Sequence, residues 1–383
     1  MPSINFPTWF DRVSFDEPVD QALAKEVSKR AAKRVFVLMS ATLRRNAALA
    51  NALKAALGDS IADLHADIPQ HSPLPSVLDA AKAAKAVQAD LLVSIGGGSI
   101  IDAVKVIQFC LAHEMFSEDA VRAWRQAGAK SPAKHPSLAH ISVPTTLSGA
   151  EFTPFAGARN PASGLKEAFF ARDLTPRALI FDSALTVLTP EQLWLSSGIR
   201  AIDHAVEGIC SDRSHPLGDA FAQRGIAQLA ANLRATKNTP SDAVSRRESQ
   251  FGAWFASTPL MSGVPMGASH AIGHVIGSVF HITHGLTSCV MLPAVMRYNY
   301  ESVPDRLQKV AEALGGKEGQ AAPDLVRDVI VGLGLPSRLG DVGLGRDVFD
   351  ALANGAMEEG WLRTNPRPVK NRDDVIRILE MAL

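Results

Sequence analysis

The second half of the chain holds histidines at spacings that suit chemistry. His204 stands apart, and a group of four falls within fifteen residues: His270, His274, His281 and His284. His270 and His274 are four residues apart and share one helix face, and Gly285 predicts a turn that brings His284 back toward them. Neutral imidazoles bind transition metals, relay protons or polarise a carbonyl group. The cluster predicts a site, although each histidine alone also fits a buried residue bonded to the backbone.

A glycine-rich turn in the first half predicts a second kind of site. The apolar run at 91–95 predicts a strand, and a helix is expected from near Ser99. Between them, Gly96, Gly97 and Gly98 would let a pyrophosphate approach backbone N–H groups at the positive end of the helix dipole. The run matches neither the G-x-G-x-x-G pattern nor a P-loop, so a plain tight turn is the alternative interpretation.

The elements that position these residues follow a β-α-β rhythm in the first half. Short apolar runs predict strands at 34–39, 61–64, 91–95 and 138–143, and helices are expected at 43–57, at 76–87 and after Ser99. This order is typical of a parallel sheet with helices on both faces. From Thr189-Pro190 onward the periodicity is helical, with a polar turn at 238–242. We therefore expect an α/β domain over 1–186 and an all-α domain over 187–383.

Composition excludes several classes of protein. The chain has 383 residues, and its 39 basic residues balance 39 acidic ones, so no overall field attracts nucleic acid or an anionic membrane. We find no stretch of eighteen uncharged apolar residues. The three cysteines are far apart in apolar surroundings and are interpreted as reduced packing residues. We expect a cytoplasmic protein with neither a nucleic-acid nor a membrane partner.

Several ordered motifs resemble the iron-containing, or group III, alcohol dehydrogenases. They are Gly96-Gly97-Gly98-Ser99-Ile100-Ile101-Asp102, Pro144-Thr145-Thr146, Gly198-Ile199-Arg200-Ala201-Ile202-Asp203-His204, His270-Ala271-Ile272-Gly273-His274, Thr283-His284-Gly285 and Asn365-Pro366-Arg367-Pro368. The resemblance implies a Rossmann-like dinucleotide-binding domain that binds NAD or NADP, a helical domain, and a catalytic cleft between them. It also implies a homodimer formed through edge elements of the first domain.

The family's usual metal ligands are one aspartate and three histidines. The resemblance assigns the histidines to His204, His270 and His284, but the aspartate position, four residues before His204, is Arg200. A guanidinium repels a cation, so conventional iron binding is in doubt. Three alternatives stay open. Asp203 substitutes as a ligand, although it points about 100° away from His204 on a helix; three histidines hold zinc with an open position; or Arg200 swings out into a structural salt bridge and says nothing about the substrate.

The 144–151 segment also departs from the family's usual pattern, and its shorter form resembles that of the maleylacetate reductase branch. The segment Pro144-Thr145-Thr146-Leu147-Ser148-Gly149-Ala150-Glu151 is one residue shorter than the usual motif. That branch lacks the first aspartate and works without metal on an anionic oxo acid. Arg200 then becomes a candidate anchor for a substrate carboxylate, since a guanidinium binds carboxylates in bidentate fashion. The branch usually has Asn at the Arg200 position and a further histidine where this chain has Ser269.

The resemblance also assigns roles residue by residue. His274 is the candidate proton donor. If no metal is present, His204, His270 and His284 orient the substrate, and Arg200 helps to stabilise the developing alkoxide. The candidate cofactor-binding residues are Ser40, Gly96, Gly97, Gly98, Ser99, Asp102, Thr145, Thr146, Ser148 and Lys166. Ser40 stands where NAD-selective relatives often have an acidic residue, and Arg44 or Arg45 nearby suits a 2′-phosphate, so NADP should be tolerated.

These residues are compatible with three functions. The leading one is NAD(P)H-dependent reduction of a ketone or oxo acid, maleylacetate reductase-like and without metal, acting on a small carboxylate-bearing substrate. The second is an iron- or zinc-dependent alcohol dehydrogenase that uses His204, His270 and His284. The third is a nucleotide-binding protein that has lost catalysis, which the presence of His274 at its expected position argues against.

Overall fold

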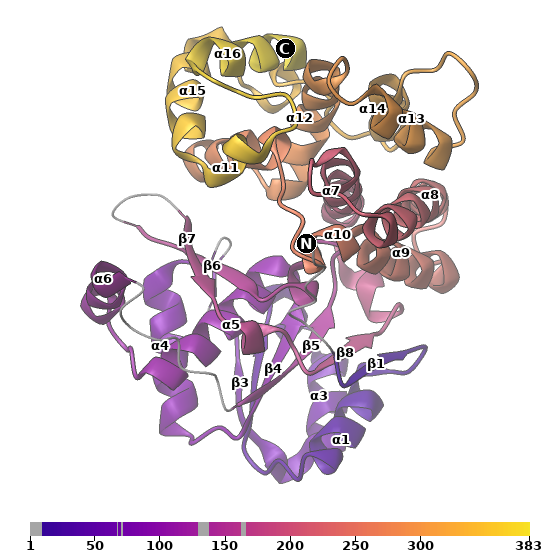
Figure 1. The fold of residues 1–383 in the computed structure, drawn as a ribbon. Coiled ribbons are helices and arrows are strands. Elements are labelled where there is room, and N and C mark those ends of the chain that lie inside the picture. The colour runs from indigo at the N-terminus through magenta and orange to yellow at the C-terminus, as the bar shows by residue number, and fades with distance from the viewer. Residues whose placement is uncertain (1–9, 67, 70–71, 129–137, 162–165) are drawn as a thin grey trace. The chain divides into compact units, whose positions relative to one another are not determined.

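A computed structural model describes residues 10–66, 68–69, 72–128, 138–161 and 166–383. It divides into two compact units, of which one ends at Leu188 and the other comprises Thr189–Leu383. The first domain expected from the sequence begins at residue 1, and its residues 1–9 lie outside the described part. Figure 1 labels the elements of both units.

The first unit is built on a six-stranded sheet in which every neighbouring pair is parallel, as predicted. Its order is β1-β8-β5-β4-β2-β3. The strands are β1 (Arg12–Phe15), β2 (Val35–Met39), β3 (Ile61–His65), β4 (Leu91–Gly96), β5 (Ala139–Pro144) and β8 (Ala178–Phe181). A separate antiparallel hairpin joins β6 (Phe155–Arg159) to β7 (Lys166–Phe170).

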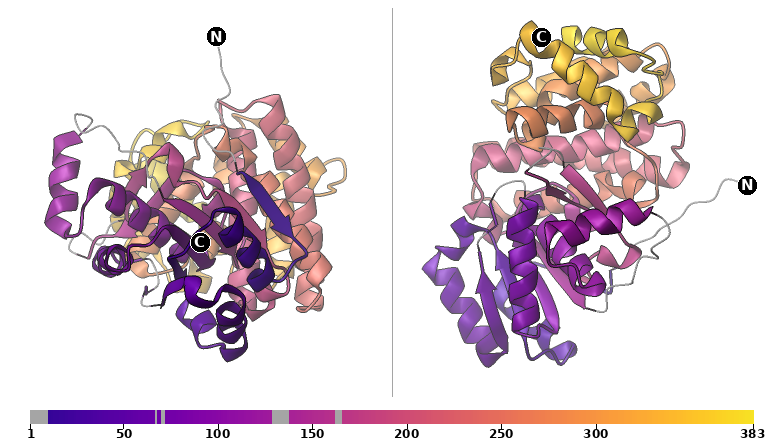
Figure 2. Two further views of the ribbon diagram at one scale, coloured as in Figure 1. Left: turned by 90° about the horizontal axis from the view of Figure 1, so that it is seen from below. Right: turned by 90° about the vertical axis from the view of Figure 1, so that its left-hand side faces the viewer.

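Helices cover both faces of the sheet because successive strand side chains point to opposite sides. On one face, Phe36 and Leu38 of β2 pack into a core with α4 and α5; on the other, Val35 and Val37 pack with α1 and α3. Figures 1 and 2 show these layers in indigo to magenta. The helices of this unit are α1 (Val19–Lys29), α2 (Ala41–Arg44), α3 (Ala47–Leu57), α4 (Leu74–Ala86), α5 (Gly98–His113) and α6 (Glu118–Ala127).

The strand order reverses direction between β2 and β4. From β2 the chain moves to β3 at one edge, then returns to β4 on the other side of β2. Ser40 follows β2, and its N–H donates to the Ile95 carbonyl at the end of β4 (3.1 Å). In open α/β sheets, ligands bind outside the carboxyl ends of the strands at such a switch point. The glycine-rich turn after β4 begins at this point.

Two sequence expectations for this unit need correction. The single helix expected over 43–57 is two helices, α2 and α3, because the Asn46 side chain accepts from Leu49 N–H (3.0 Å) and starts a new helix. In addition, β1, β6, β7 and β8 were not expected. β1 and β8 have only four residues each, too few for a period-2 pattern to stand out.

Residues Thr189–Leu383, all described, form helices and no strand, as the sequence predicts. The α-helices are α7 (Glu191–Cys210), α8 (Pro216–Asn238), α9 (Ala243–Ala256), α10 (Thr258–Met261), α11 (Ala268–Phe280), α12 (His284–Asn299), α13 (Pro304–Ala313), α14 (Ala322–Gly332), α15 (Phe349–Glu358) and α16 (Arg372–Ala382). A short 3-10 helix, η8 (Gly360–Thr364), precedes α16. The buried face of α11 packs with α12, α15 and α16 in one apolar core.

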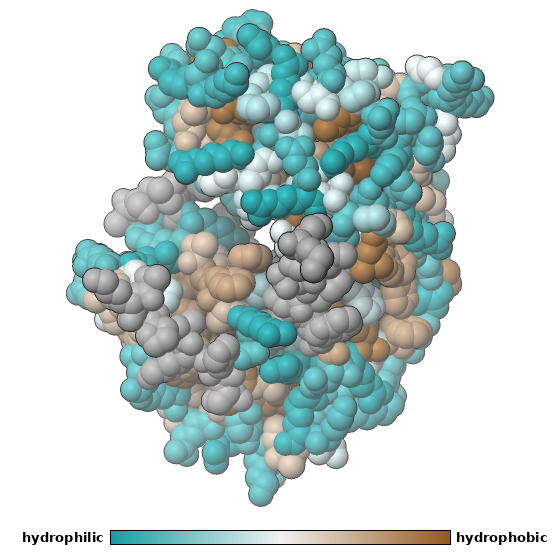
Figure 3. Space-filling view, in the orientation of Figure 1, coloured by the Kyte–Doolittle hydropathy of each residue, from teal (hydrophilic) through white to brown (hydrophobic). Residues whose placement is uncertain are grey.

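The face drawn in Figure 3 is mostly hydrophilic, with hydrophobic residues in small separate patches. Within the described ranges, no helix is long and apolar enough to cross a membrane. Cys110, Cys210 and Cys289 are buried and free, as expected for packing residues.

Candidate active site

The glycine-rich turn packs too closely for side chains at its three glycines. An added Cβ would lie 2.8 Å from Ile100 Cγ1 at Gly96, 2.9 Å from Thr146 Cγ2 at Gly97 and 2.8 Å from Ser148 Oγ at Gly98. Gly97 is the N-cap of α5 and supplies no side-chain cap. The turn therefore exposes backbone N–H groups at the start of a long helix, where the dipole favours an anion.

The segment after β5 forms the neighbouring wall of this turn. Thr145 N–H donates to the Gly96 carbonyl (3.0 Å) and ties the two segments together. In the described part of the chain, Thr146 Oγ1 and Ser148 Oγ are buried yet make no hydrogen bond. Two buried hydroxyls without partners beside a glycine cradle fit the phosphate oxygens of a dinucleotide.

The predicted cofactor-binding residues fall into two groups. Ser40, the glycines, Ser99, Thr145, Thr146 and Ser148 gather at the carboxyl ends of β2, β4 and β5. Asp102 and Lys166 instead pair with each other, because Lys166 Nζ donates to Asp102 Oδ2 (2.7 Å). The same carboxylate oxygen accepts from Gly157 N–H (3.3 Å), so Asp102 holds the β6–β7 hairpin against α5.

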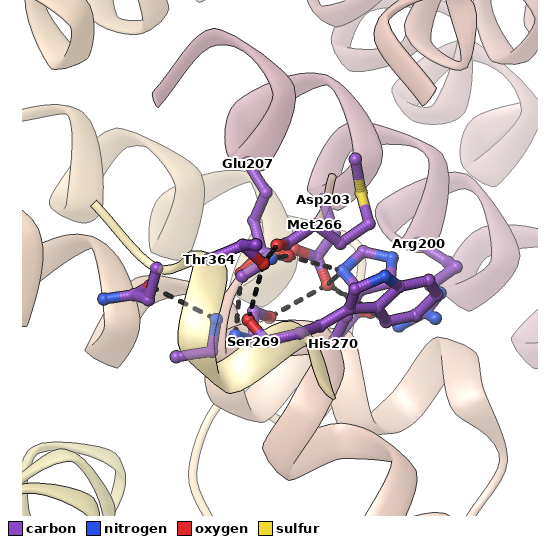
Figure 4. Close-up of polar contacts among 12 residues, drawn as sticks. Arg200, Asp203, Glu207, Met266, Ser269, His270 and Thr364 are labelled. Carbon is purple, nitrogen blue, oxygen red and sulfur yellow. Dashed lines mark hydrogen bonds and ion pairs between the residues drawn. The ribbon is translucent and has the colours of Figure 1, made fainter. Parts of the chain in front are cut away.

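In the helical unit, one face of α7 carries four polar side chains. Arg200, Asp203, His204 and Glu207 recur at intervals of three and four residues and therefore lie on the same side of the helix. All four are buried, and Asp203 has no exposed surface. Figure 4 shows Arg200, Asp203 and Glu207 pointing toward Ser269 and His270 of α11.

Glu207 caps the start of α11 from the neighbouring helix. Its two carboxylate oxygens accept from Gly267 N–H (2.8 Å) and Ser269 N–H (2.7 Å). Ala268 N–H donates to Asn365 Oδ1 (3.2 Å), which gives the Asn365-Pro366-Arg367-Pro368 motif a structural role at the same helix end. The amides that α11 leaves without intrahelical partners are thus satisfied by distant side chains.

The same carboxylate orients His270. His270 Nδ1 lies 2.7 Å from Glu207 Oε2, whereas His270 Nε2 makes no hydrogen bond within the described residues. When Glu207 is ionised, Nδ1–H donates to it and the lone pair of the imidazole is on Nε2. His204 Nδ1 is likewise buried without a hydrogen bond in that part of the chain.

Asp203 joins Arg200 to two serines. Its Oδ2 accepts from Ser269 Oγ (2.9 Å) and Ser288 Oγ (2.6 Å) and lies 3.8 Å from Arg200 Nη1. Arg200 Nη1 also donates to Ser288 Oγ (3.2 Å). Arg200 is thus part of a buried ion pair and does not swing out of the helical unit. A guanidinium has five N–H donors, more than these contacts use, so others remain for a ligand.

Burial sets the protonation of this cluster. It raises the pKa of the Asp203 carboxyl to about 7, helped by the nearby charge of Glu207, and it raises the pKa of Glu207 to about 7. Burial also holds the pKa of His204 and His270 well below the usual range, and the Arg200 charge acts in the same direction. Both histidines are therefore neutral at physiological pH.

A chain of ring contacts connects the four candidate histidines through Trp361, a residue that no sequence motif marks. Ring centroids are 4.8 Å apart for His204 and His270, and 5.6 Å apart for His274 and His284. Between these pairs, the Trp361 indole lies 5.6 Å from His270 and 5.1 Å from His274. Trp361 thus forms an apolar wall against two of the candidate catalytic residues.

His274 is more open than His270. It keeps 25% of its side-chain surface exposed, and its Nδ1 lies 3.4 Å from Glu359 Oε2. The carboxylate of Glu359 was not predicted as part of the site. A partly exposed imidazole beside a carboxylate suits proton exchange with solvent.

The expected turn at Gly285 is wrong. The chain reverses instead at His281, a non-glycine residue with φ of 57°, and Gly285 lies inside α12. Glycine is needed there because an added Cβ would come within 2.7 Å of the Ser196 backbone on α7. Gly285 therefore permits close packing of α7 and α12, and the reversal at 281–283 returns His284 to His274.

The residues present fit a divalent cation poorly. Among the described residues, the possible ligand group with all donor atoms within 4.8 Å comprises Asp203, Glu207 and His270, not the predicted set of His204, His270 and His284. The carboxylate oxygens of that group already accept hydrogen bonds from the α11 amides and from Ser269, and Glu207 also pairs with His270. A buried guanidinium stands where the family's aspartate ligand would, and its charge opposes a cation.

Comparison with known proteins agrees with this architecture. A family model for the iron-containing alcohol dehydrogenases matches residues 11–183, and a model for the C-terminal part of the same family matches residues 194–383. The chain belongs to the iron-containing alcohol dehydrogenase family, and it is an oxidoreductase of this NAD(P)-dependent group.

Individual relatives include maleylacetate reductases. Dehydrogenase ALT3 from Alternaria alternata is 32% identical, with 91% of this chain and 98% of that protein covered. Maleylacetate reductase from Sphingobium indicum is 29% identical, with 97% and 95% covered. The crystal structure of maleylacetate reductase from Rhizobium sp. strain MTP-10005 superposes with a TM-score of 0.82 at 27% identity, covering 100% of this chain and 99% of that one.

Proposed function

We propose that this oxidoreductase uses NADH or NADPH to reduce a small carboxylate-bearing oxo acid, as the name maleylacetate reductase describes for several relatives, and that it needs no catalytic metal. The observation that carries the proposal is the buried guanidinium of Arg200 beside His204 and His270. It puts a fixed positive charge where the family's usual ligand set would gather a cation.

The cofactor half of the proposal rests on the turn after β4. The close approach to the glycine backbone and the free hydroxyls of Thr146 and Ser148 suit the pyrophosphate. At the end of β2, the Ser40 side chain caps α2 and is not a carboxylate. Arg45, directly after α2, is exposed. The Ser40 side chain has no negative charge to repel a 2′-phosphate, so we expect both cofactors to bind.

The substrate half rests on charge and geometry in the helical unit. Arg200 would bind the substrate carboxylate through guanidinium N–H groups that Ser288 does not use. The neutral imidazoles of His204 and His270 would offer their free nitrogens to polar groups of the substrate. The indole of Trp361 would keep water away from the His270 ring that it contacts.

Reduction of the oxo acid needs a hydride and a proton. Reduced nicotinamide, when bound, supplies the hydride. His274 is the proposed proton donor, since its partly exposed ring can regain a proton from solvent and Glu359 balances the charge of its protonated form. Arg200 stabilises negative charge on the substrate during the transfer.

A substrate panel tests this function. Purified protein with NADH or NADPH is offered maleylacetate, other short oxo acids, and uncharged ketones and aldehydes of matched size, and absorbance at the NAD(P)H band is followed. The proposal predicts kcat/KM at least about ten-fold higher for the acids than for the uncharged analogues. Equal or higher values for uncharged carbonyl compounds would overturn the proposed substrate class.

A further inference from the structure

Lys105 of α5 is a buried ammonium that the proposed mechanism does not use. It has no exposed surface and is among the largest fully buried side chains of the described chain. Its Nζ donates to three backbone carbonyls: Ala150 (2.5 Å), Thr153 (2.5 Å) and Phe155 (3.1 Å). An ammonium has three N–H donors, and all three have a carbonyl acceptor.

Burying the Lys105 ammonium costs desolvation free energy. Burial lowers the pKa of Lys105 to about 8, while the charges of Asp102 and Glu151 favour its protonated form. An apolar side chain here would avoid the desolvation but would leave carbonyls of the 150–155 segment without this donor. The buried Lys105 ammonium is therefore explained by the carbonyls of the 150–155 segment to which it donates.

The segment that Lys105 holds continues directly from the nucleotide-binding wall. Thr146 and Ser148 contact the glycine turn, and η3 (Ala150–Phe152) and the start of β6 follow at once. The glycine turn begins α5, and Lys105 lies two helical turns further along the same helix. One rigid helix thus carries one side of the cradle and anchors the other.

Asp102 performs the matching task one turn earlier. Its carboxylate receives Lys166 Nζ and Gly157 N–H and so fixes the β6–β7 hairpin to α5. Lys105 and Asp102 together attach η3, β6 and the start of β7 to this helix. Of the two, Lys105 contacts the part nearest the cradle.

We propose that Lys105 is the positioning residue of the nucleotide-binding cradle, holding the Thr146 and Ser148 hydroxyls in register with the glycine turn through its three carbonyl contacts. The proposal rests on the proposed function, because it assumes that a dinucleotide binds at this turn. The three N–H groups of Lys105 all have carbonyl acceptors, so none remains for the ligand. The effect of Lys105 is on cofactor affinity rather than on the chemical step.

The test compares Lys105→Met with a matched control, Gln108→Met. Gln108 is also buried in α5, one turn further, and its Nε2 donates to the carbonyls of Leu138 (2.7 Å) and Asp173 (3.3 Å). Both variants remove a buried donor to backbone carbonyls, but only Lys105 contacts the 150–155 segment. NADH and NADPH affinities are measured by fluorescence titration at pH 7, together with kcat at saturating cofactor and thermal unfolding.

Lys105→Met should weaken cofactor binding by about ten-fold or more, with kcat at saturation within about two-fold, whereas Gln108→Met should lose stability but keep its affinity. If Lys105→Met does not fold, Lys105→Gln, which retains two N–H donors, should show the same shift in smaller degree. Unchanged affinity in the folded Lys105 variant, or an equal loss in the Gln108 control, overturns the inference alone. Failure of the wild-type protein to bind either cofactor overturns both this inference and the proposed function.

Discussion

Replacing Arg200 by methionine tests how the site recognises an acid. Methionine keeps much of the side-chain volume but removes the positive charge and every N–H donor. Asp203 keeps its two serine donors, and since its pKa is already raised to about 7, protonation limits the cost of losing Arg200. The helical unit should therefore stay folded while its affinity for anions falls.

The size of the effect follows from the burial of the guanidinium. Arg200 exposes 8% of its surface, so its contact with a carboxylate is poorly screened. Removing one partner of such a buried pair costs about 3–5 kcal/mol, which corresponds to roughly 10²- to 4 × 10³-fold in kcat/KM for the oxo acid. Arg200→Lys keeps the charge but not the two-pronged geometry and should recover only part of the loss.

The assay compares kcat/KM for an oxo acid with that for an uncharged carbonyl compound. Arg246→Met is the matched control, because Arg246 is a buried arginine of the same unit that donates to the Pro240 carbonyl and stacks on Trp194. It should lose stability without changing substrate preference. An equal fall for both substrates in Arg200→Met would refute the role of Arg200 as a carboxylate anchor.

Three further changes have defined outcomes. His274→Ala should lower kcat by about 10²- to 10⁴-fold with unchanged NADH affinity by fluorescence; an unaltered kcat would exclude it as proton donor. Gly98→Ala should weaken NADH binding more than ten-fold in the same titration, because its Cβ would lie 2.8 Å from Ser148 Oγ. Gly332→Ala is the control: its Cβ would meet no atom within 4 Å, and NADH affinity should not change. Similar NADH affinities for the two variants would argue against this turn as the nucleotide-binding cradle. Burial raises the pKa of the Glu151 carboxyl from 4.5 to about 7, so between these pH values the native protein binds a proton that the unfolded chain does not, and its stability falls as pH rises through them. Relative to wild type, Glu151→Gln should therefore raise the free energy of unfolding in urea by up to about 3 kcal/mol at pH 8 but by little at pH 4.5. A difference that does not depend on pH would contradict this.

The central strands and the turn between β4 and α5 could be predicted because their signals are local. β2, β4 and β5 are continuous apolar runs, and glycines mark the turn between β4 and α5. β8 lies between β5 and β1 and is fully buried, yet its four residues carry no periodic signal of their own. Only its pairing partners identify it as a strand.

Residue type and spacing predict the histidine cluster, and the family resemblance singles out Arg200; the catalytic roles of these residues stay predictions. Glu207, Lys105 and Trp361 have no role predicted from the sequence, because their partners lie far away in sequence. Glu207 acts 60 residues away at Gly267, and Lys105 acts 45 residues away at Ala150. Spacing along α7 was the available signal, since Asp203 and Glu207 fall on the face that Arg200 defines.

The predicted homodimer remains a prediction. β1 is an edge strand of the described sheet, since it pairs with β8 on one side. An edge strand offers unpaired backbone groups to another chain.

The most direct test of the central claim is NAD(P)H consumption by chelator-treated protein offered maleylacetate, with the metal content of the same sample assayed. We expect the metal-depleted protein to turn over at a rate that added zinc or iron does not raise, because Arg200 supplies the positive charge of the site. No turnover until zinc or iron is restored would contradict it and would show that the histidines bind a catalytic metal despite the arginine.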